Sequence, residues 1–194
     1  MKTFKATFVG TGMIGAGLAA NAALNNFDIT LYDVVPIEKM QANLEHIMDI
    51  LVEAEAISRD KADTALAGVH DVDFVQECIP ERLQLKQDTY RTIQNVTGSS
   101  TVIASSTSAI FPSKLQEGAL YPGSIVVGHP YNPSYLLPLI EICGGEGADP
   151  AIIAKAKEIY EAMGKVSTVS GFMNCMAYVG TAVSTFTIGV LVEQ

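Results

Sequence analysis

Residues 10–15 read Gly-Thr-Gly-Met-Ile-Gly, the pattern G-x-G-x-x-G, and they follow the β-prone run Lys5–Val9. A helix of small residues is expected at 16–24, and a second strand at 28–32 then leads into Asp33. The glycine pattern is informative when it lies in a strand–turn–helix–strand setting, and that setting is present here. The sequence therefore predicts a Rossmann-type βαβ unit that binds a dinucleotide.

The three glycines have different expected roles in such a unit. Gly10 permits the tight turn, Gly12 leaves room for the pyrophosphate, and Gly15 lets the helix pack closely on the sheet. The N–H groups and the positive dipole end of the helix would face the phosphates. The carboxylate of Asp33 can accept the hydroxyls of the adenosine ribose and would repel a 2′-phosphate, which favours NAD over NADP. The predicted cofactor-binding residues of this unit are Gly10, Gly12, Met13, Ile14, Gly15 and Asp33.

The rest of the chain alternates between β-prone and helical patterns. Strands are expected at 73–79, 101–105 and 124–128, an apolar run at 136–143, and helices at 36–57, 61–66, 82–93, 112–120 and 150–163. Strands that alternate with helices indicate a mostly parallel sheet covered on both faces. The predicted fold class is therefore α/β, with a doubly wound, mostly parallel sheet over residues 1–168 and a helical excursion at 36–66.

Polar residues follow the ends of several expected strands. Asp33, Glu81, Ser108 and His129 all occupy such positions, as does the glycine-rich turn. In open α/β sheets, ligands bind beyond the carboxyl ends of the strands. We therefore expect these residues to form one site.

His129 and Glu141 are the candidate proton relay of that site. Twelve residues separate them, enough for a loop and a return strand that would place the carboxylate beside the imidazole. A carboxylate at one ring nitrogen fixes the tautomer and leaves the other nitrogen as a general base. The alternative is a structural histidine near an unrelated glutamate. Ser108 is a candidate hydrogen-bonding partner of the substrate oxygen, although a serine in a turn is often structural. Asn132 is a candidate for positioning the cofactor or its own loop.

Composition narrows the class of protein further. The 194 residues are 48% hydrophobic and carry a net charge of −9, which disfavours nucleic acid and anionic membranes as partners. The three cysteines lie far apart and match no metal or redox spacing, so we predict no metal site and expect buried thiols in a reducing cytosol. The chain runs from Met1 into the first strand without a signal-peptide pattern, which predicts a cytoplasmic protein.

Together these motifs resemble the L-3-hydroxyacyl-CoA dehydrogenase family. The resemblance covers about residues 5–145 and includes Gln-Glu-Cys-Ile-Pro-Glu at 76–81, Ser-Ser-Thr-Ser at 105–108 and Gly-His-Pro-Tyr-Asn-Pro at 128–133. It implies an NAD-dependent enzyme that oxidises a hydroxyl group β to a carboxyl or thioester on a small molecule. It also implies that His129 is the catalytic base, Glu141 its partner, Ser108 a contact to substrate and nicotinamide, and Glu81, Lys86 and Asn132 cofactor contacts.

Within the family, the sequence looks most like the enzymes that oxidise L-carnitine to 3-dehydrocarnitine, with those that oxidise L-gulonate close behind. Coenzyme A carries several phosphate charges that usually need Lys or Arg, whereas the helical excursion offers few cations among many acids. A quaternary ammonium instead suits aromatic faces and an acidic field. A 3-hydroxyacyl-CoA substrate is the alternative, and a non-catalytic NAD-binding module without its substrate domain is a third hypothesis.

Two regions depart from the family pattern. Residues 66–71 are too short for the strand and helix that the family has there. The family continues into a helical domain that forms the dimer, whereas residues 169–194 predict only a truncated C-terminal helical extension, in which Asn174 matches a substrate-contacting asparagine. Residues 166–192 carry no charge. They are long enough to span a bilayer, but their polar content favours a buried strand and helix covered by a second subunit. We therefore expect a homo-oligomer.

Overall fold

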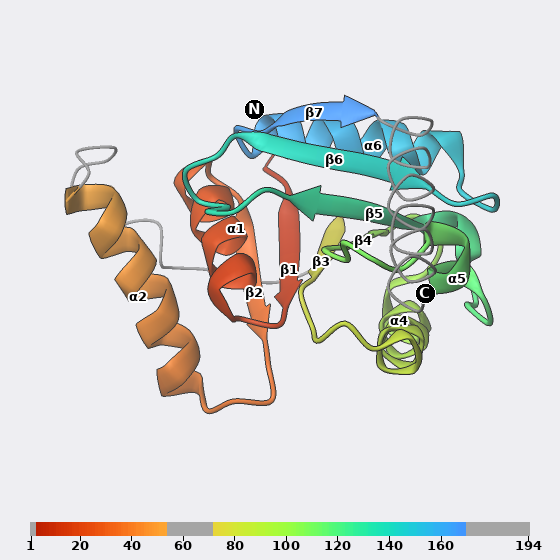
Figure 1. Cartoon of the computed structure of the whole chain (residues 1–194), viewed down its shortest axis with the longest axis horizontal. Helices are drawn as coiled ribbons and strands as arrows, with labels where there is room; N and C mark the ends of the chain where they lie inside the picture. The colour runs from red at the N-terminus through yellow and green to blue at the C-terminus, as the bar shows by residue number, and fades with distance from the viewer. Residues whose placement is uncertain (1–2, 54–71, 170–194) are drawn as a thin grey trace, which may run out of the picture.

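The computed structural model describes residues 3–53 and 72–169, which form a seven-stranded sheet with helices on both faces (Figure 1). The strands are β1 (Lys5–Val9), β2 (Asp28–Tyr32), β3 (Phe74–Glu77), β4 (Val102–Ser105), β5 (Ile125–Pro130), β6 (Leu139–Gly144) and β7 (Val166–Val169). The helices are α1 (Met13–Leu24), α2 (Ile37–Glu53), α4 (Leu83–Thr97), α5 (Pro112–Gln116) and α6 (Pro150–Ala162), with a short 3₁₀ turn at Pro122–Ser124.

The strands are ordered β2-β1-β3-β4-β5-β6-β7 across the sheet. All neighbours run parallel except β5 and β6, which pair antiparallel. The predicted α/β class with a Rossmann-type, mostly parallel sheet is therefore confirmed. The expected helix at 61–66, the short segment 66–71 and the C-terminal residues 170–194, including Asn174, lie outside the described residues.

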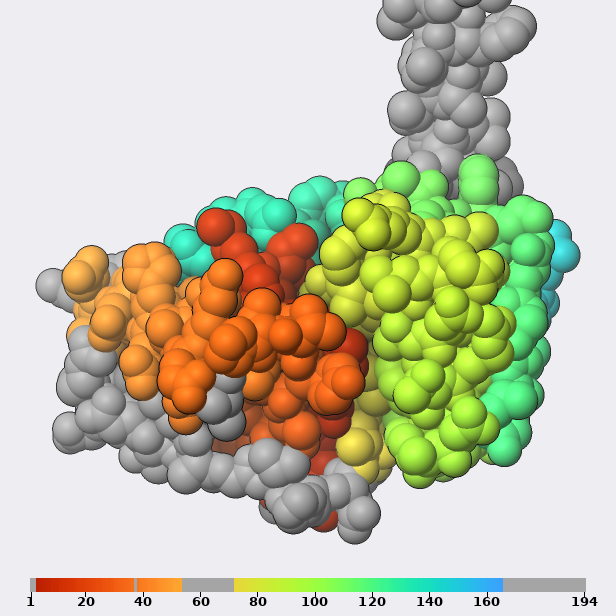
Figure 2. Space-filling model, turned by 90° about the horizontal axis from the view of Figure 1, so that it is seen from below, coloured from red at the N-terminus to blue at the C-terminus, as the bar shows by residue number. Residues whose placement is uncertain are grey.

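Two hydrophobic clusters cover the two faces of the sheet. One contains the apolar residues of α1, α2 and α6, and the other contains Tyr90 of α4 and Leu115 of α5. Successive strand residues alternate between them: Val102 and Ala104 join the first cluster, and Ile103 joins the second. This period of two fixes the face on which each helix packs. Figure 2 shows α4 (yellow-green) beside the segment from β2 into α2 (orange), with residues from the start of the chain (red) between them.

Several element boundaries differ from the sequence prediction. β5 was predicted to end before His129, but it continues to Pro130 because its antiparallel pairing with β6 includes His129 and Pro130. β3 is shorter than the predicted 73–79, α5 ends at Gln116 instead of 120, and α4 continues to Thr97. Gly98 ends α4 with a positive φ of 80°, a conformation that favours glycine.

Candidate functional site

The glycine-rich turn joins β1 to α1 and has the geometry that a pyrophosphate site needs. Gly10 adopts φ +91°, and a Cβ at this position would lie 2.7 Å from the Cys78 carbonyl oxygen. A Cβ on Gly15 would collide with the Gly10 carbonyl, so the helix approaches the turn too closely for a side chain. By contrast, a Cβ on Gly12 would meet no atom within 4 Å. The first and third glycines therefore shape the turn, and the second leaves its outer side open to a ligand.

The N-terminus of α1 presents hydrogen-bond donors beside this open position. No side chain caps the helix, whose first i→i−4 bond runs from the Ala16 N–H to the Gly12 carbonyl. Met13 is exposed and Ile14 is half-buried, so the first turn is accessible from outside. Uncapped N–H groups at the positive end of a helix dipole suit an anion. These residues fit the pyrophosphate of a dinucleotide.

Asp33 follows β2 and is held by hydrogen bonds from two sides. Its Oδ2 accepts from the Thr11 backbone N–H (2.5 Å) and the Thr11 hydroxyl (2.7 Å), and its Oδ1 accepts from the Val34 N–H (2.7 Å). Burial raises the pKa of Asp33, but the bonds from Thr11, Val34 and Val35 outweigh that effect and hold the pKa below its usual value. A carboxylate that stays ionised beside the glycine-rich turn can accept ribose hydroxyls.

Asn43 of α2 donates from Nδ2 to the Thr11 carbonyl oxygen at 2.8 Å. The helical excursion therefore contacts the glycine-rich turn directly. Thr11 is 1% exposed and joins β1, the turn and α2. The sequence offered no signal for this contact, because Asn43 lies in an ordinary amphipathic helix.

His129 and Glu141 face each other across the only antiparallel strand pair in the described part of the sheet. They are directly paired in the β5–β6 register, and His129 Nδ1 lies 3.2 Å from Glu141 Oε2. Both side chains are partly exposed, at 24% and 20%. Directly opposite residues in an antiparallel pair have adjacent side chains. The predicted loop and return strand thus bring the two groups together, while their catalytic role stays a prediction.

Tyr131 interacts with both members of this pair. Its ring lies 5.6 Å from the His129 ring, centroid to centroid, and a hydrogen bond to Glu141 raises the pKa of the Tyr131 hydroxyl. Glu141 therefore interacts with both an imidazole and a phenol.

Ser108 and Asn132 lie in exposed loops that follow β4 and β5. Ser105 and Val127 are in register across these two parallel strands, so the residues that follow them leave the sheet at the same edge. The peptide bond between Asn132 and Pro133 is cis. Both side chains are accessible to a ligand, as the prediction requires.

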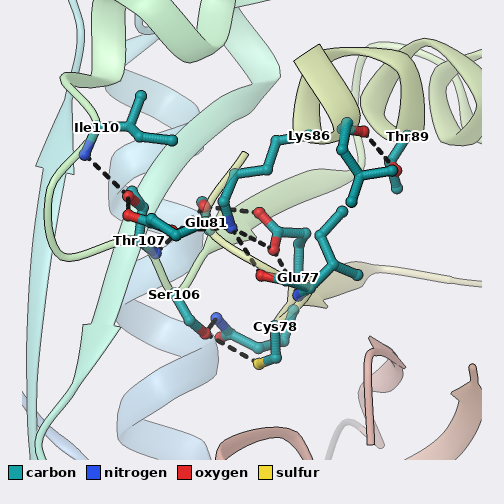
Figure 3. Close-up of polar contacts among 12 residues, drawn as sticks. Glu77, Cys78, Glu81, Lys86, Thr89, Ser106, Thr107 and Ile110 are labelled. Atoms are coloured by element: carbon teal, nitrogen blue, oxygen red, sulfur yellow. Dashed lines mark hydrogen bonds and ion pairs between the residues drawn. The ribbon is translucent and has the colours of Figure 1, made fainter. Parts of the chain in front are cut away.

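Glu81 and Lys86 connect the loop after β3 to the loop after β4 (Figure 3). The Thr107 hydroxyl donates to Glu81 Oε1, which also accepts from the Ala109 N–H at 3.2 Å. Lys86 Nζ lies 3.4 Å from Glu81 Oε2. Burial raises the pKa of Glu81, but the Thr107 bond, the Lys86 charge and the Ala109 bond together hold it below its usual value. Glu81 therefore fastens the loop that carries Ser108.

Lys86 is 1% exposed. Besides Glu81, its ammonium donates to Glu77 Oε1 at 2.7 Å and to the Ile79 carbonyl oxygen at 3.2 Å. An ammonium group has three donors, and these three acceptors match them. A direct contact between Lys86 and the cofactor stays a prediction; in the structure Lys86 contacts Glu81.

Glu77 is the buried centre of this cluster, and the sequence analysis assigned it no role. It is 0% exposed. Oε1 accepts from Lys86 and from the Ile79 N–H (2.8 Å), and Oε2 accepts from the hydroxyls of Tyr90 (2.5 Å) and Ser105 (2.7 Å). A carboxylate has about four acceptor positions, and all are used. The signal was available, because a glutamate inside a buried strand needs such partners.

A second network that the sequence analysis missed lies next to Gly128, the residue before His129. Gln76 donates from Nε2 to the Gly128 carbonyl oxygen (3.2 Å) and to Ser106 Oγ (2.9 Å), and its Oε1 accepts from the Tyr160 hydroxyl (2.5 Å). A Cβ on Gly128 would collide with that hydroxyl. Gln76 therefore joins β3, β5 and α6 at the residue that precedes His129.

Residues 3–53 and 72–169 contain neither a candidate metal cluster nor a candidate membrane-spanning helix. No group of three or more His, Cys, Asp or Glu side chains there could hold a metal ion. In the same residues, no helix is both long and apolar enough to cross a membrane.

Comparison with known proteins places this site in a family. The model of the 3-hydroxyacyl-CoA dehydrogenase NAD-binding domain matches residues 5–171, and the chain belongs to that family. NAD is the cofactor that the family domain binds, which confirms the prediction from the glycine-rich turn and Asp33.

The relatives with the names that follow are similar to this chain over most of its length. The chain is 41% identical over 169 residues to an L-carnitine dehydrogenase/betainyl-CoA thioesterase of Ruegeria pomeroyi, covering 82% of this chain and 34% of the relative. It is 39% identical over 172 residues to an L-carnitine dehydrogenase of Pseudomonas putida, covering 84% and 53%. The chain thus spans about a third to a half of the length of these relatives. A 3-hydroxybutyryl-CoA dehydrogenase of Escherichia coli K12 superposes with a TM-score of 0.77 at 22% identity, covering 86% of this chain and 38% of that one; this similarity shows the fold alone.

Proposed function

We propose that this chain provides the NAD-binding and proton-relay half of a dehydrogenase that oxidises the 3-hydroxyl group of a small carboxylate, with L-carnitine as the first candidate substrate. The observation that carries the proposal is the His129–Glu141 pair at 3.2 Å, in a chain of this family that also has the dinucleotide turn. Bound NAD would accept the hydride from the substrate carbon.

The orientation of His129 defines its part in the reaction. Its Nδ1 faces the Glu141 carboxylate, so Nδ1 carries the hydrogen and Nε2 is left to take the proton from the substrate hydroxyl. Glu141 would stabilise the imidazolium that forms, in the manner of a triad carboxylate. Ser108, exposed at the same edge of the sheet, would hydrogen-bond the substrate oxygen.

The choice of L-carnitine rests on two further observations. The relatives at about 40% identity are named L-carnitine dehydrogenases, and the chain has a net charge of −9, which suits a substrate with a quaternary ammonium. Tyr131, 39% exposed beside the histidine, offers an aromatic face for that cation. The sugar acid L-gulonate and a 3-hydroxyacyl-CoA are the competing substrates.

The test measures NADH formation by absorbance at alkaline pH, with L-carnitine, L-gulonate and 3-hydroxybutyryl-CoA in parallel and NAD binding measured separately. We expect turnover with L-carnitine. His129→Gln should lower the rate by roughly 10²–10⁴-fold and leave NAD binding unchanged. Retained turnover in that variant would refute the relay. Intact NAD binding without turnover on any substrate would instead favour an NAD-binding module that is not catalytic by itself.

A further inference from the structure

Lys165 lies between α6 and β7 and is 4% exposed. Its Nζ donates to the Ser134 carbonyl oxygen (2.5 Å) and the Leu137 carbonyl oxygen (3.0 Å). No carboxylate of residues 3–53 or 72–169 forms an ion pair with it. A buried ammonium held only by backbone carbonyls is unusual, because burying a charge without a counter-charge is costly.

Both carbonyls belong to the loop 131–138, which joins β5 to β6 and thereby joins His129 to Glu141. This loop contains one helical turn, in which the N–H groups of Leu136 and Leu137 donate to the Pro133 carbonyl. A lysine at the end of such a turn can satisfy carbonyls that lack a helical partner.

The same loop rests on α1, the helix of the dinucleotide turn (Figure 1). The Ser134 hydroxyl donates to the Ile14 carbonyl oxygen at 3.3 Å, and Asn21 Nδ2 donates to the Ser134 carbonyl oxygen at 3.0 Å. A Cβ on Gly17 would collide with Ser134 Oγ. The loop therefore contacts α1 from its first turn, at Ile14, as far as Asn21.

We propose that Lys165 is a positioning residue, whose ammonium fastens loop 131–138 against α1 and so sets the His129–Glu141 pair relative to the bound cofactor. The Ser134 carbonyl accepts both from Lys165 and from Asn21 of α1, which makes it the point where the two elements are joined. Lys165 follows Ser134 by thirty-one residues in the chain.

The protonation of the Lys165 amine is compatible with this role. Burial lowers its pKa from 10.5 to about 8, and no ionised group of the described residues contributes to the shift. Whether charged or neutral, the amine retains at least two hydrogens for its two acceptors. The fastening is therefore expected to persist through neutral and mildly alkaline pH.

The test uses the fact that the chain has only three histidines, His46, His70 and His129. Nitrogen-15 NMR of the full chain reports the imidazole tautomers, and His129→Gln assigns the third signal without any catalytic assay. We expect Lys165→Met to remove the single Nδ1–H tautomer signature of His129 and leave the His46 signals unchanged. Lys165→Arg should restore the signature, and Lys157→Met, at an exposed position on α6, should have no effect.

A second test measures kcat and KM; it rests on the proposed function, whereas the NMR test does not. If the enzyme turns over, Lys165→Met should lower kcat roughly ten- to a hundredfold, as expected for misplaced reacting groups, and change the KM for NAD less than about twofold. Should Lys165→Met fail to fold, Asn21→Ala removes the α1 side of the same junction and should produce the same loss of the His129 signature. An unchanged His129 signature in a folded Lys165→Met or Asn21→Ala protein would overturn the proposal.

Discussion

The loops after β3 and β4 differ from the loop after β5 in how they are held. The first two are joined by charges: Glu77, Lys86 and Glu81 form a chain of ion pairs that ends at Thr107, next to Ser108. The loop after β5 is held through uncharged groups of its own: Lys165 and Asn21 donate to its backbone carbonyls, and its Ser134 hydroxyl donates to α1. A buried lysine is therefore accommodated in two ways: a carboxylate compensates the charge of Lys86, whereas burial lowers the pKa of Lys165.

The largest effect is expected from breaking the charged cluster. Glu77→Gln should lower the free energy of unfolding by about 3–5 kcal/mol, because it removes the main counter-charge of a fully buried ammonium. Urea denaturation measures the change. The double variant Glu77→Gln/Lys86→Met should recover part of the loss, since it removes both charges together. An equal or larger loss in the double variant would show that hydrogen bonding, and not charge, dominates.

Glu117→Gln is the matched control for that experiment. Glu117 also pairs with a lysine, Lys114, at 2.6 Å, but both side chains are 57% exposed. Exposed ion pairs contribute little to stability. We therefore expect no measurable change from this substitution, which would confirm that burial causes the difference.

The sequence and the structure agree where periodicity and glycine spacing determine the result. β1 and β2 were predicted with the observed bounds, because each is bounded by the glycine-rich turn or by polar residues. The His129–Glu141 contact was also foreseen, since a strand, a loop and a return strand leave few other arrangements. These features depend on neighbours within about thirty residues of the chain.

The supporting groups of the site could not be predicted in the same way. Lys165 lies after an amphipathic helix, and its acceptors are backbone atoms that no residue type reveals. The position of Tyr160 beneath Gly128 depends on the distance between α6 and β5. Such contacts join segments far apart in sequence, and their partners are set by packing. Glu77 is the exception, because its position in a buried strand was visible in the sequence.

The next largest effect is expected in the pH dependence of the free energy of unfolding, to which Lys165 contributes. The pKa in the folded protein, about 8, is below the ordinary 10.5, so between these values the unfolded chain binds a proton that the folded chain has released. Stability therefore rises with pH across this window, by at most about 3 kcal/mol for a shift of this size. Below about pH 8 both states are protonated, and the cost of burying the charge is constant.

Urea denaturation of the wild type and of Lys165→Met at several pH values measures this contribution as a difference. We expect the wild type to gain stability relative to the variant as the pH rises from 8 to 10.5. The Cys78 pKa, raised by burial to about 12, acts in the opposite direction but is common to both proteins and cancels. A constant difference across the window would show that Lys165 does not release its proton there.

Asp33 differs from Glu77 and Glu81, because its hydrogen-bond donors within residues 3–53 and 72–169 are backbone N–H groups and one hydroxyl. Asp33→Asn should weaken NAD binding by roughly tenfold, equivalent to about 1.4 kcal/mol, because the amide accepts fewer hydrogen bonds from the ribose and from Thr11. Calorimetric titration with NAD measures the change. Asp28→Asn, at the start of the same strand, is the control and should bind NAD as the wild type does. Equal affinity in both variants would place the ribose elsewhere.

The smallest effect is expected at Glu81, the exposed end of the charged cluster. Its side chain is 40% exposed, so solvent screens its interaction with Lys86. Its pKa in the folded protein lies below the ordinary value, so its contribution is fully present above the unfolded pKa of about 4.3 and is lost as the pH falls through the lower folded value. The Glu81→Gln variant tests this contribution. Amide hydrogen exchange of residues 106–111 should be slower in the wild type than in Glu81→Gln at neutral pH. The two proteins should converge in acid, because protonated Glu81 no longer attracts Lys86. If the wild type and Glu81→Gln exchange equally in this loop at neutral pH as well as in acid, then Glu81 does not hold the Ser108 loop, and the charges of the cluster act only on the core.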